Sequence, residues 1–131
     1  MAKTILITGA SSGLGAGMAR EFAAKGYNLA LCARRLERLE TLKQELQSQY
    51  SIQVGIKVLD VTHYDDVFTV FKAFQQDFGT IDRIIVNAGV GEGRRIGKGH
   101  FDVNRATAET NFISALAQCE AAVEIFRAQN K

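Results

Sequence analysis

The sequence predicts an α/β fold in which a parallel sheet carries helices on both faces. Short apolar runs alternate strictly with longer amphipathic stretches along the 131 residues, which is the pattern of repeated strand and helix units. A chain that follows each strand with a helix returns to the same end of the sheet, so its strands run parallel. Glycines also stand where the units turn, as at Gly9, Gly26 and Gly79.

Four strands and four helices are predicted, in alternation. The strands are short apolar runs at residues 3–8, 28–33, 52–59 and 81–86, and we expect the Rossmann-type order 3-2-1-4. The helices place apolar residues at helical spacing. Their expected buried faces are Leu14, Met18 and Phe22 before Gly26; Leu36, Leu39, Leu42 and Leu46; Val67, Val70, Phe71, Phe74 and Phe78 before Gly79; and Phe112, Leu116, Cys119, Val123 and Phe126 in a last helix over residues 102–128.

We expect residues 1–131 to form one domain, because the chain has no internal repeat, no low-complexity tract and no proline. The fourth strand would be an apolar edge strand that holds Ile84, Ile85 and Val86. Natural sheets seldom leave such an edge bare. We therefore expect the sheet to be cut before a fifth strand, which is missing or comes from another chain.

Composition excludes several classes of function. The chain is 47% hydrophobic and 23% charged, and no segment approaches the roughly 20 apolar residues that a membrane helix needs. The run Ile5-Leu6-Ile7 is too short for a signal peptide, so we expect a cytoplasmic protein with no membrane contact. A net charge of +2 is too small to indicate nucleic acid as a partner. Cys32 and Cys119 are expected to be small core residues, which indicates neither a disulfide nor a metal site.

A glycine-rich turn connects the first strand to the first helix. It comprises Thr8, Gly9, Ala10, Ser11, Ser12, Gly13, Leu14 and Gly15. Gly9 suits a positive φ, Gly13 lets a pyrophosphate approach the backbone, and Gly15 lets the helix lie close to the sheet. Ser11 and Ser12 can add hydroxyl donors. The spacing therefore predicts a dinucleotide site at the helix N-terminus, with a tight turn of purely structural role as the alternative.

The end of the second strand indicates which dinucleotide. Ala33 occupies the position where an NAD site usually carries an acid, and Arg34 and Arg35 follow at once. Guanidinium groups can bind the 2′-phosphate that a carboxylate would repel. We predict NADP(H) as the cofactor, with Arg34 as the main contact; the alternative is that both arginines only open a charged, solvated helix.

These residues together resemble the short-chain dehydrogenase/reductase family. The turn from Thr8 to Gly15 resembles the family's TGxxxGxG, and Asp60-Val61 resembles its adenine-contacting Asp-Val. Asn87, Ala88 and Gly89 resemble its NAG motif, and Asn111 matches its active-site proton-relay asparagine. The resemblance implies hydride transfer between nicotinamide and a small carbonyl or alcohol compound, by a homo-oligomer.

Each motif also has a physical interpretation from the residues alone. Asp60 could accept a hydrogen bond from the adenine amino group while Val61 packs on the ring, or Asp60 could cap the next helix. Asn87 could bridge backbone groups, and Gly89 would let the chain pass beneath a ribose. Asn111 is expected on the apolar side of its helix, where a buried structural amide is the alternative.

The chain departs from the family in its reactive residues. The family's chemistry uses a serine and a Tyr-x-x-x-Lys pair, whereas Tyr27, Tyr50 and Tyr64 are not followed by lysine four residues later, and Ser114 lies within the last helix. We therefore expect the cofactor-binding, amino-terminal part of such an enzyme, inactive by itself. A non-catalytic nucleotide-binding or interaction module is the second hypothesis.

Residues 91–100 form a glycine-rich basic loop that holds Arg94, Arg95 and Lys98. In an open α/β sheet, loops at the carboxyl ends of the strands are where ligands bind. A role in contacting substrate and a merely solvated loop are both open, and His100 is given no chemistry.

Overall fold

The computed structural model describes residues 2–88 and 95–130 as a four-stranded parallel sheet with helices on both faces. The strands β1 (Thr4–Thr8), β2 (Asn28–Ala33), β3 (Val54–Val58) and β4 (Arg83–Ile85) take the order β3-β2-β1-β4. The predicted fold class and strand order are confirmed. The first, third and fourth strands are shorter than predicted, because residues such as Ile81 lie outside the paired register.

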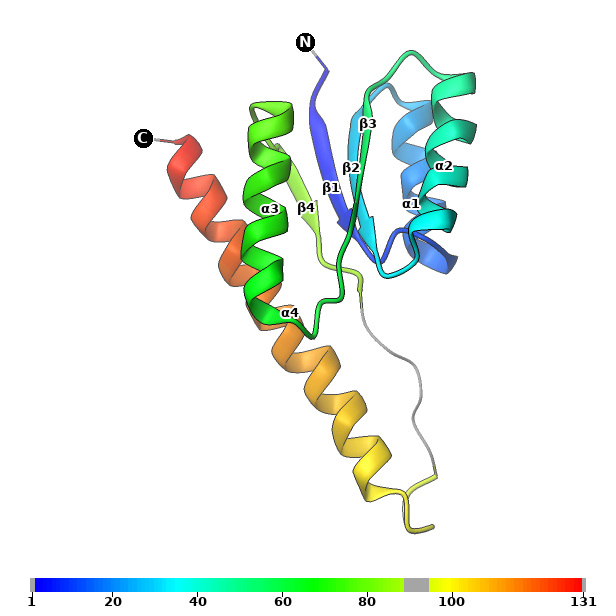
Figure 1. The fold of residues 1–131 in the computed structure, drawn as a ribbon, viewed down its shortest axis with the longest axis vertical. Helices are drawn as coiled ribbons and strands as arrows, with labels where there is room; N and C mark the ends of the chain where they lie inside the picture. The colour runs from blue at the N-terminus through cyan, green and yellow to red at the C-terminus, as the bar shows by residue number, and fades with distance from the viewer. Residues whose placement is uncertain (1, 89–94, 131) are drawn as a thin grey trace.

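Two helices cover each face of the sheet (Figure 1). The helices α1 (Gly13–Ala24) and α2 (Leu36–Gln49) lie on one face, and α3 (Tyr64–Phe78) and α4 (Phe101–Gln129) lie on the other. Each face of the sheet has its own hydrophobic core, and alternate residues of β1 belong to one or the other. Ile5 and Ile7 pack under α1 and α2, whereas Leu6 packs under α3 and α4. This alternation is the period-two pattern of a strand that is buried on both sides.

The prediction for the face of α1 was wrong at Leu14, which is 73% exposed. The buried residues are Gly15, Ala16, Ala19 and Ala23, while Met18 and Phe22 pack at the margin of the core. Small residues face the sheet because α1 lies too close to it for larger ones. In α2, Leu39, Leu42 and Leu46 are buried as predicted, but Leu36 is 43% exposed at the start of the helix.

The prediction for α4 was wrong for most of its face. Its buried residues are Ser114, Gln118, Ala121, Ala122 and Ile125. Phe112, Leu116, Cys119 and Val123 are exposed, and only Phe126 of the predicted set packs against the core. The bulky Phe71 and Phe74 of α3 pack beside α4, where Ala121, Ala122 and Ile125 join them in one core.

The two cysteines differ. Cys32 is buried as predicted, its thiol donates a weak hydrogen bond to the Ile7 carbonyl (3.9 Å), and burial raises its pKa to about 12. Cys119 is exposed. Within residues 2–88 and 95–130, no helix is long and apolar enough to cross a membrane, and no group of three or more metal-ligating side chains could hold a metal ion.

Only the carboxyl-terminal half of α4 is docked on the body of the molecule, while its first half extends past the sheet (Figure 1). The docked end is fixed by Gln129. Its Oε1 accepts a hydrogen bond from the Ile81 amide (2.8 Å), and its Nε2 donates to the Ile81 carbonyl (2.9 Å). The side chain thus supplies the partner that Ile81 lacks in the sheet.

We expect Gln129→Ala to lower the free energy of unfolding by about 2 kcal/mol, because both backbone groups of the buried Ile81 lose their partner. Urea unfolding followed by circular dichroism measures the change. The matched control is Gln47→Ala on α2, an exposed glutamine. Equal effects of the two substitutions would contradict the role of Gln129.

Candidate cofactor site at the carboxyl edge of the sheet

The glycine turn is held by close contacts between backbone segments. Gly9 adopts φ +65°, and a Cβ there would lie 2.9 Å from the Cα of Ala88. A Cβ on Gly15 would overlap the carbonyl oxygen of Gly9 and lie 2.7 Å from Nδ2 of Asn87. Both glycines are therefore required by close approach, as the sequence predicted for Gly15.

Thr8 and Asn87 tie β1 to the segment that follows β4. The Thr8 hydroxyl accepts hydrogen bonds from the amides of Asn87 and Ala88, both at 3.0 Å. The Asn87 side-chain amide donates to the carbonyl of Gly9 at 3.2 Å. Asn87 thus connects the backbone of the glycine turn to the segment after β4, as predicted from its position at the end of the fourth strand.

The start of α1 faces open space. Gly13 adopts φ +57°, and no heavy atom from elsewhere in the described chain lies within 4 Å of the position of a Cβ there. Ser12 is the N-cap residue, but its side chain makes no capping hydrogen bond. The first amides of a helix have no partner within the helix and carry the positive end of its dipole, so this end of α1 suits an anion.

A cleft of about 770 Å³ lies beside this turn and across the carboxyl ends of the strands. Of the predicted cofactor residues, those that line the cleft are Gly9, Ser11, Ser12, Arg34, Arg35, Asp60, Val61, Asn87 and Ala88. The cleft is not lined by Thr8, Gly13, Leu14 or Gly15. The Thr8 hydroxyl bonds to the segment after β4, Gly15 packs against the Gly9 carbonyl, and Leu14 is exposed to solvent. Gly89 and residues 91–94 lie outside the described part of the chain.

One wall of the cleft is basic. It carries Arg34, Arg35 and Arg38 from the end of β2 and the first turn of α2. No salt bridge found among residues 2–88 and 95–130 involves these arginines. Cations at the positive end of a helix oppose its dipole, so this placement indicates a binding role and does not stabilise α2. The sequence analysis did not predict that Arg38 lines the cleft, although Arg38 follows Arg34 by about one helical turn.

Asp60, which follows β3, also lines the cleft. Its Oδ1 accepts hydrogen bonds from the hydroxyl (2.7 Å) and the amide (3.0 Å) of Thr62. The hydrogen bonds from the hydroxyl and the amide of Thr62, with smaller contributions from the charges of His63 and Arg34, hold the pKa of Asp60 below its usual value. The carboxylate thus stays ionised and serves as an acceptor, while the N-cap of α3 is His63.

The opposite wall comes from the extended half of α4. Its lining residues are Asp102, Val103, Ala106, Thr107 and Thr110. These residues recur at helical spacing, which could have indicated that they share one face of the helix. Most of them are small or polar, so they do not form the apolar stripe by which a helix face is recognised. Asn111 follows Thr110 but is exposed and does not line the cleft, so the expectation that it lies on a buried apolar side was wrong.

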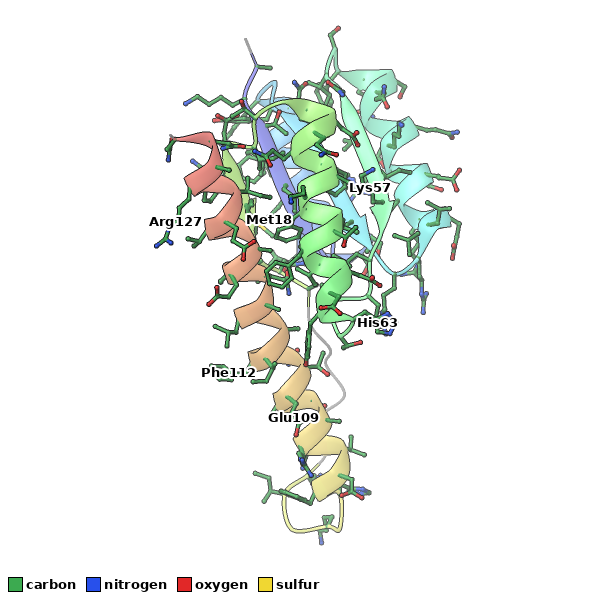
Figure 2. All side chains as sticks on the ribbon, turned by 60° about the vertical axis from the view of Figure 1, so that its left-hand side comes forward. Met18, Lys57, His63, Glu109, Phe112 and Arg127 are labelled. Atoms are coloured by element: carbon green, nitrogen blue, oxygen red, sulfur yellow. The ribbon has the colours of Figure 1, made fainter. Side chains whose placement is uncertain are left out.

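The solvent-facing side of this half of α4 carries the exposed apolar residues Phe101 and Phe112 beside the Arg105–Glu109 ion pair. Figure 2 shows Phe112 projecting from α4 away from the sheet, and this side chain is 71% exposed. Arg95 to His100, the described part of the basic loop, are all exposed ahead of α4. The loop residues thus make no contribution to the described walls of the cleft.

The chain is similar to known dehydrogenases over nearly its whole length. A family model for short chain dehydrogenases matches residues 3–131. An uncharacterized oxidoreductase of Mycobacterium tuberculosis is 54% identical over 123 residues, which are 93% of this chain and 49% of that protein. The chain thus spans about half the length of this relative.

Solved structures agree with this similarity. An alcohol dehydrogenase from the archaeon Thermococcus sibiricus, complexed with 5-hydroxy-NADP, matches with a TM-score of 0.90 and 31% identity, over 98% of this chain and 55% of that one. A xylitol dehydrogenase bound to NAD+ also matches with a TM-score of 0.90, at 25% identity, over 98% of this chain and 49% of that one. Structures of this fold thus carry either nicotinamide dinucleotide.

The turn geometry makes a prediction that compares two glycines of the same helix. Gly15→Ala should lower the free energy of unfolding by about 2–3 kcal/mol, because the new methyl group overlaps the Gly9 carbonyl. Gly17→Ala adds the same methyl group where no atom from outside the helix lies within 4 Å, and should stabilise the chain by up to about 1 kcal/mol. Chemical denaturation measures both, and a tolerated Gly15→Ala would refute the close approach.

Proposed function

The chain belongs to the short-chain dehydrogenase family, and from this premise we propose that its cleft binds NADP(H). We further propose that it forms the cofactor-binding part of an oxidoreductase that acts on a small carbonyl or alcohol compound. The observation that carries the cofactor assignment is the end of β2, where Ala33 replaces the usual acid and Arg34 and Arg35 line the cleft. When bound, the nicotinamide would supply or accept the hydride.

The residues present fit this cofactor at several points. The open space at Gly13 and the uncommitted hydroxyl of Ser12 suit the pyrophosphate. The ionised Asp60 has one oxygen on Thr62 and can offer the other to the adenine amino group, with Val61 lining the cleft beside it. Arg34 and Arg35 suit the 2′-phosphate. Gly89 lies outside the described residues, and its contact with the ribose stays a prediction from its motif.

Asn111 is assigned to the proton relay by family resemblance alone. It follows Thr110, the last residue of α4 that lines the cleft. The chain lacks the family's Tyr-x-x-x-Lys pair. We therefore propose that residues 1–131 hold the cofactor without turning it over.

A second candidate function is supported by the outer face of α4. Exposed Phe112, Leu116 and Val123 and the edge strand β4 favour a module that binds a nucleotide and pairs with another chain. The same face supports a homo-oligomer. The free thiols of Cys32 and Cys119 suit a reducing compartment, and we propose the cytoplasm.

We expect Arg34→Asp to weaken NADP binding by at least about tenfold, because the new carboxylate repels a 2′-phosphate that carries roughly two negative charges. Binding of NAD, which lacks this phosphate, should weaken much less. Isothermal titration calorimetry measures both affinities with the same preparation. An unchanged NADP affinity in this variant would show that the assignment of the cofactor is wrong.

The purified 131-residue chain should bind NADPH without oxidising it in the presence of aldehydes or ketones, since it lacks the Tyr-x-x-x-Lys pair that supplies the proton in this family. The loss of NADPH absorbance over time measures turnover. Binding measured in the same sample serves as the control for a folded site. Steady consumption of NADPH that depends on a carbonyl substrate would contradict this proposal.

A further inference from the structure

We propose that Arg38 is a specificity-determining residue that, together with Arg34, binds the 2′-phosphate of NADP. This inference rests on the proposed function of the cleft and adds to it a residue outside the motifs described above. Arg38 lines the same cleft as Arg34 and Arg35, although it lies inside α2 and not in the connection from β2.

The position of Arg38 follows from the helical repeat. Residues three and four apart share one side of a helix, so Arg38 lies on the side of α2 to which Arg34 and Arg35 lead. The first turn of α2 is anchored here, because the Leu39 amide donates to the carbonyl of Arg35 (3.3 Å) and Leu39 is fully buried. The backbone that carries Arg38 is therefore fixed against the sheet, and its side chain faces the cleft.

The guanidinium group of Arg38 has no carboxylate committed to it in the described residues. Other arginines do: Arg20 binds Glu45 through two hydrogen bonds of 2.8 and 3.3 Å, and Arg105 binds Glu109 at 2.7 Å. The acids of the cleft are Asp60, whose Oδ1 is held by Thr62, and Asp102 on the far wall. Arg38 thus keeps its donors available for a ligand.

A phosphate monoester is the ligand chemistry that this cluster fits. It carries up to two negative charges and three acceptor oxygens, which is more than one guanidinium fork can satisfy through paired hydrogen bonds. A second guanidinium can neutralise the remaining charge and bind the third oxygen. The 2′-hydroxyl of NAD offers neither, so Arg38 should contribute to NADP affinity and leave NAD affinity unchanged.

The test compares Arg38→Gln with the wild-type chain in calorimetric titrations with NADP and with NAD. Lys43→Gln is the matched control, because it removes one cation from the same helix outside the cleft. We expect Arg38→Gln to weaken NADP binding by about tenfold, as the loss of a charge-assisted hydrogen bond should. NAD affinity in this variant, and both affinities in Lys43→Gln, should change less than about twofold.

Thermal unfolding of each variant by circular dichroism reports whether the fold is retained, and Arg38→Lys separates charge from shape. A lysine should restore part of the NADP affinity, because it supplies the charge without the fork. Equal loss of NADP and NAD binding in Arg38→Gln, or no loss of either, would overturn the role of Arg38. A wild-type chain that binds NADP no better than NAD would overturn the proposed cofactor itself.

Discussion

The close approach of α1 to the end of β1 is the constraint on which the candidate site depends. Gly15 lies against the carbonyl of Gly9, Asn87 donates a hydrogen bond to that carbonyl, and Thr8 accepts two backbone hydrogen bonds from the segment after β4. The glycine turn and the distant segment after β4 thus meet without any bulky side chain between them. This packing directs the start of α1 toward open space and leaves its first amides for a ligand.

Charge then distinguishes the two walls of the cleft. Arg34, Arg35 and Arg38 gather where the dipole of α2 disfavours cations, an arrangement that a bound phosphate would relieve. Asp60 stays ionised beside them because Thr62 holds one carboxylate oxygen. In the proposed function, the arginines would bind a doubly charged phosphate and the Asp60 carboxylate would accept a hydrogen bond from a base. The α4 wall adds the polar side chains of Asp102, Thr107 and Thr110.

The sequence allowed the sheet and most of the site to be predicted, because glycines and apolar strands act through local geometry. The order of the strands and the residues of β2 follow from short-range patterns, and so does the role of Gly15. The faces of α1 and α4 did not follow. In α1, the close approach to the sheet selects small residues for the buried side, so that Leu14 turns outward. In α4, Gln118 and Ile125 are buried while Phe112 is exposed, an arrangement that the apolar pattern did not indicate. The role of Arg38 could not be predicted, because one more cation in a charged helix matches no sequence motif for a binding site.

In the proposed function, NADP occupies one continuous cleft from the Gly9 turn to the first turn of α2. An amide NMR titration of the isotope-labelled chain with NADP tests this claim most directly, because each of these segments has resolved backbone amides of its own. We expect NADP to cause saturable shifts in residues 9–13, 33–38 and 60–62, and NAD to leave residues 34–38 nearly unshifted. Shifts confined to other parts of the chain, or equal responses of residues 34–38 to both dinucleotides, would contradict it.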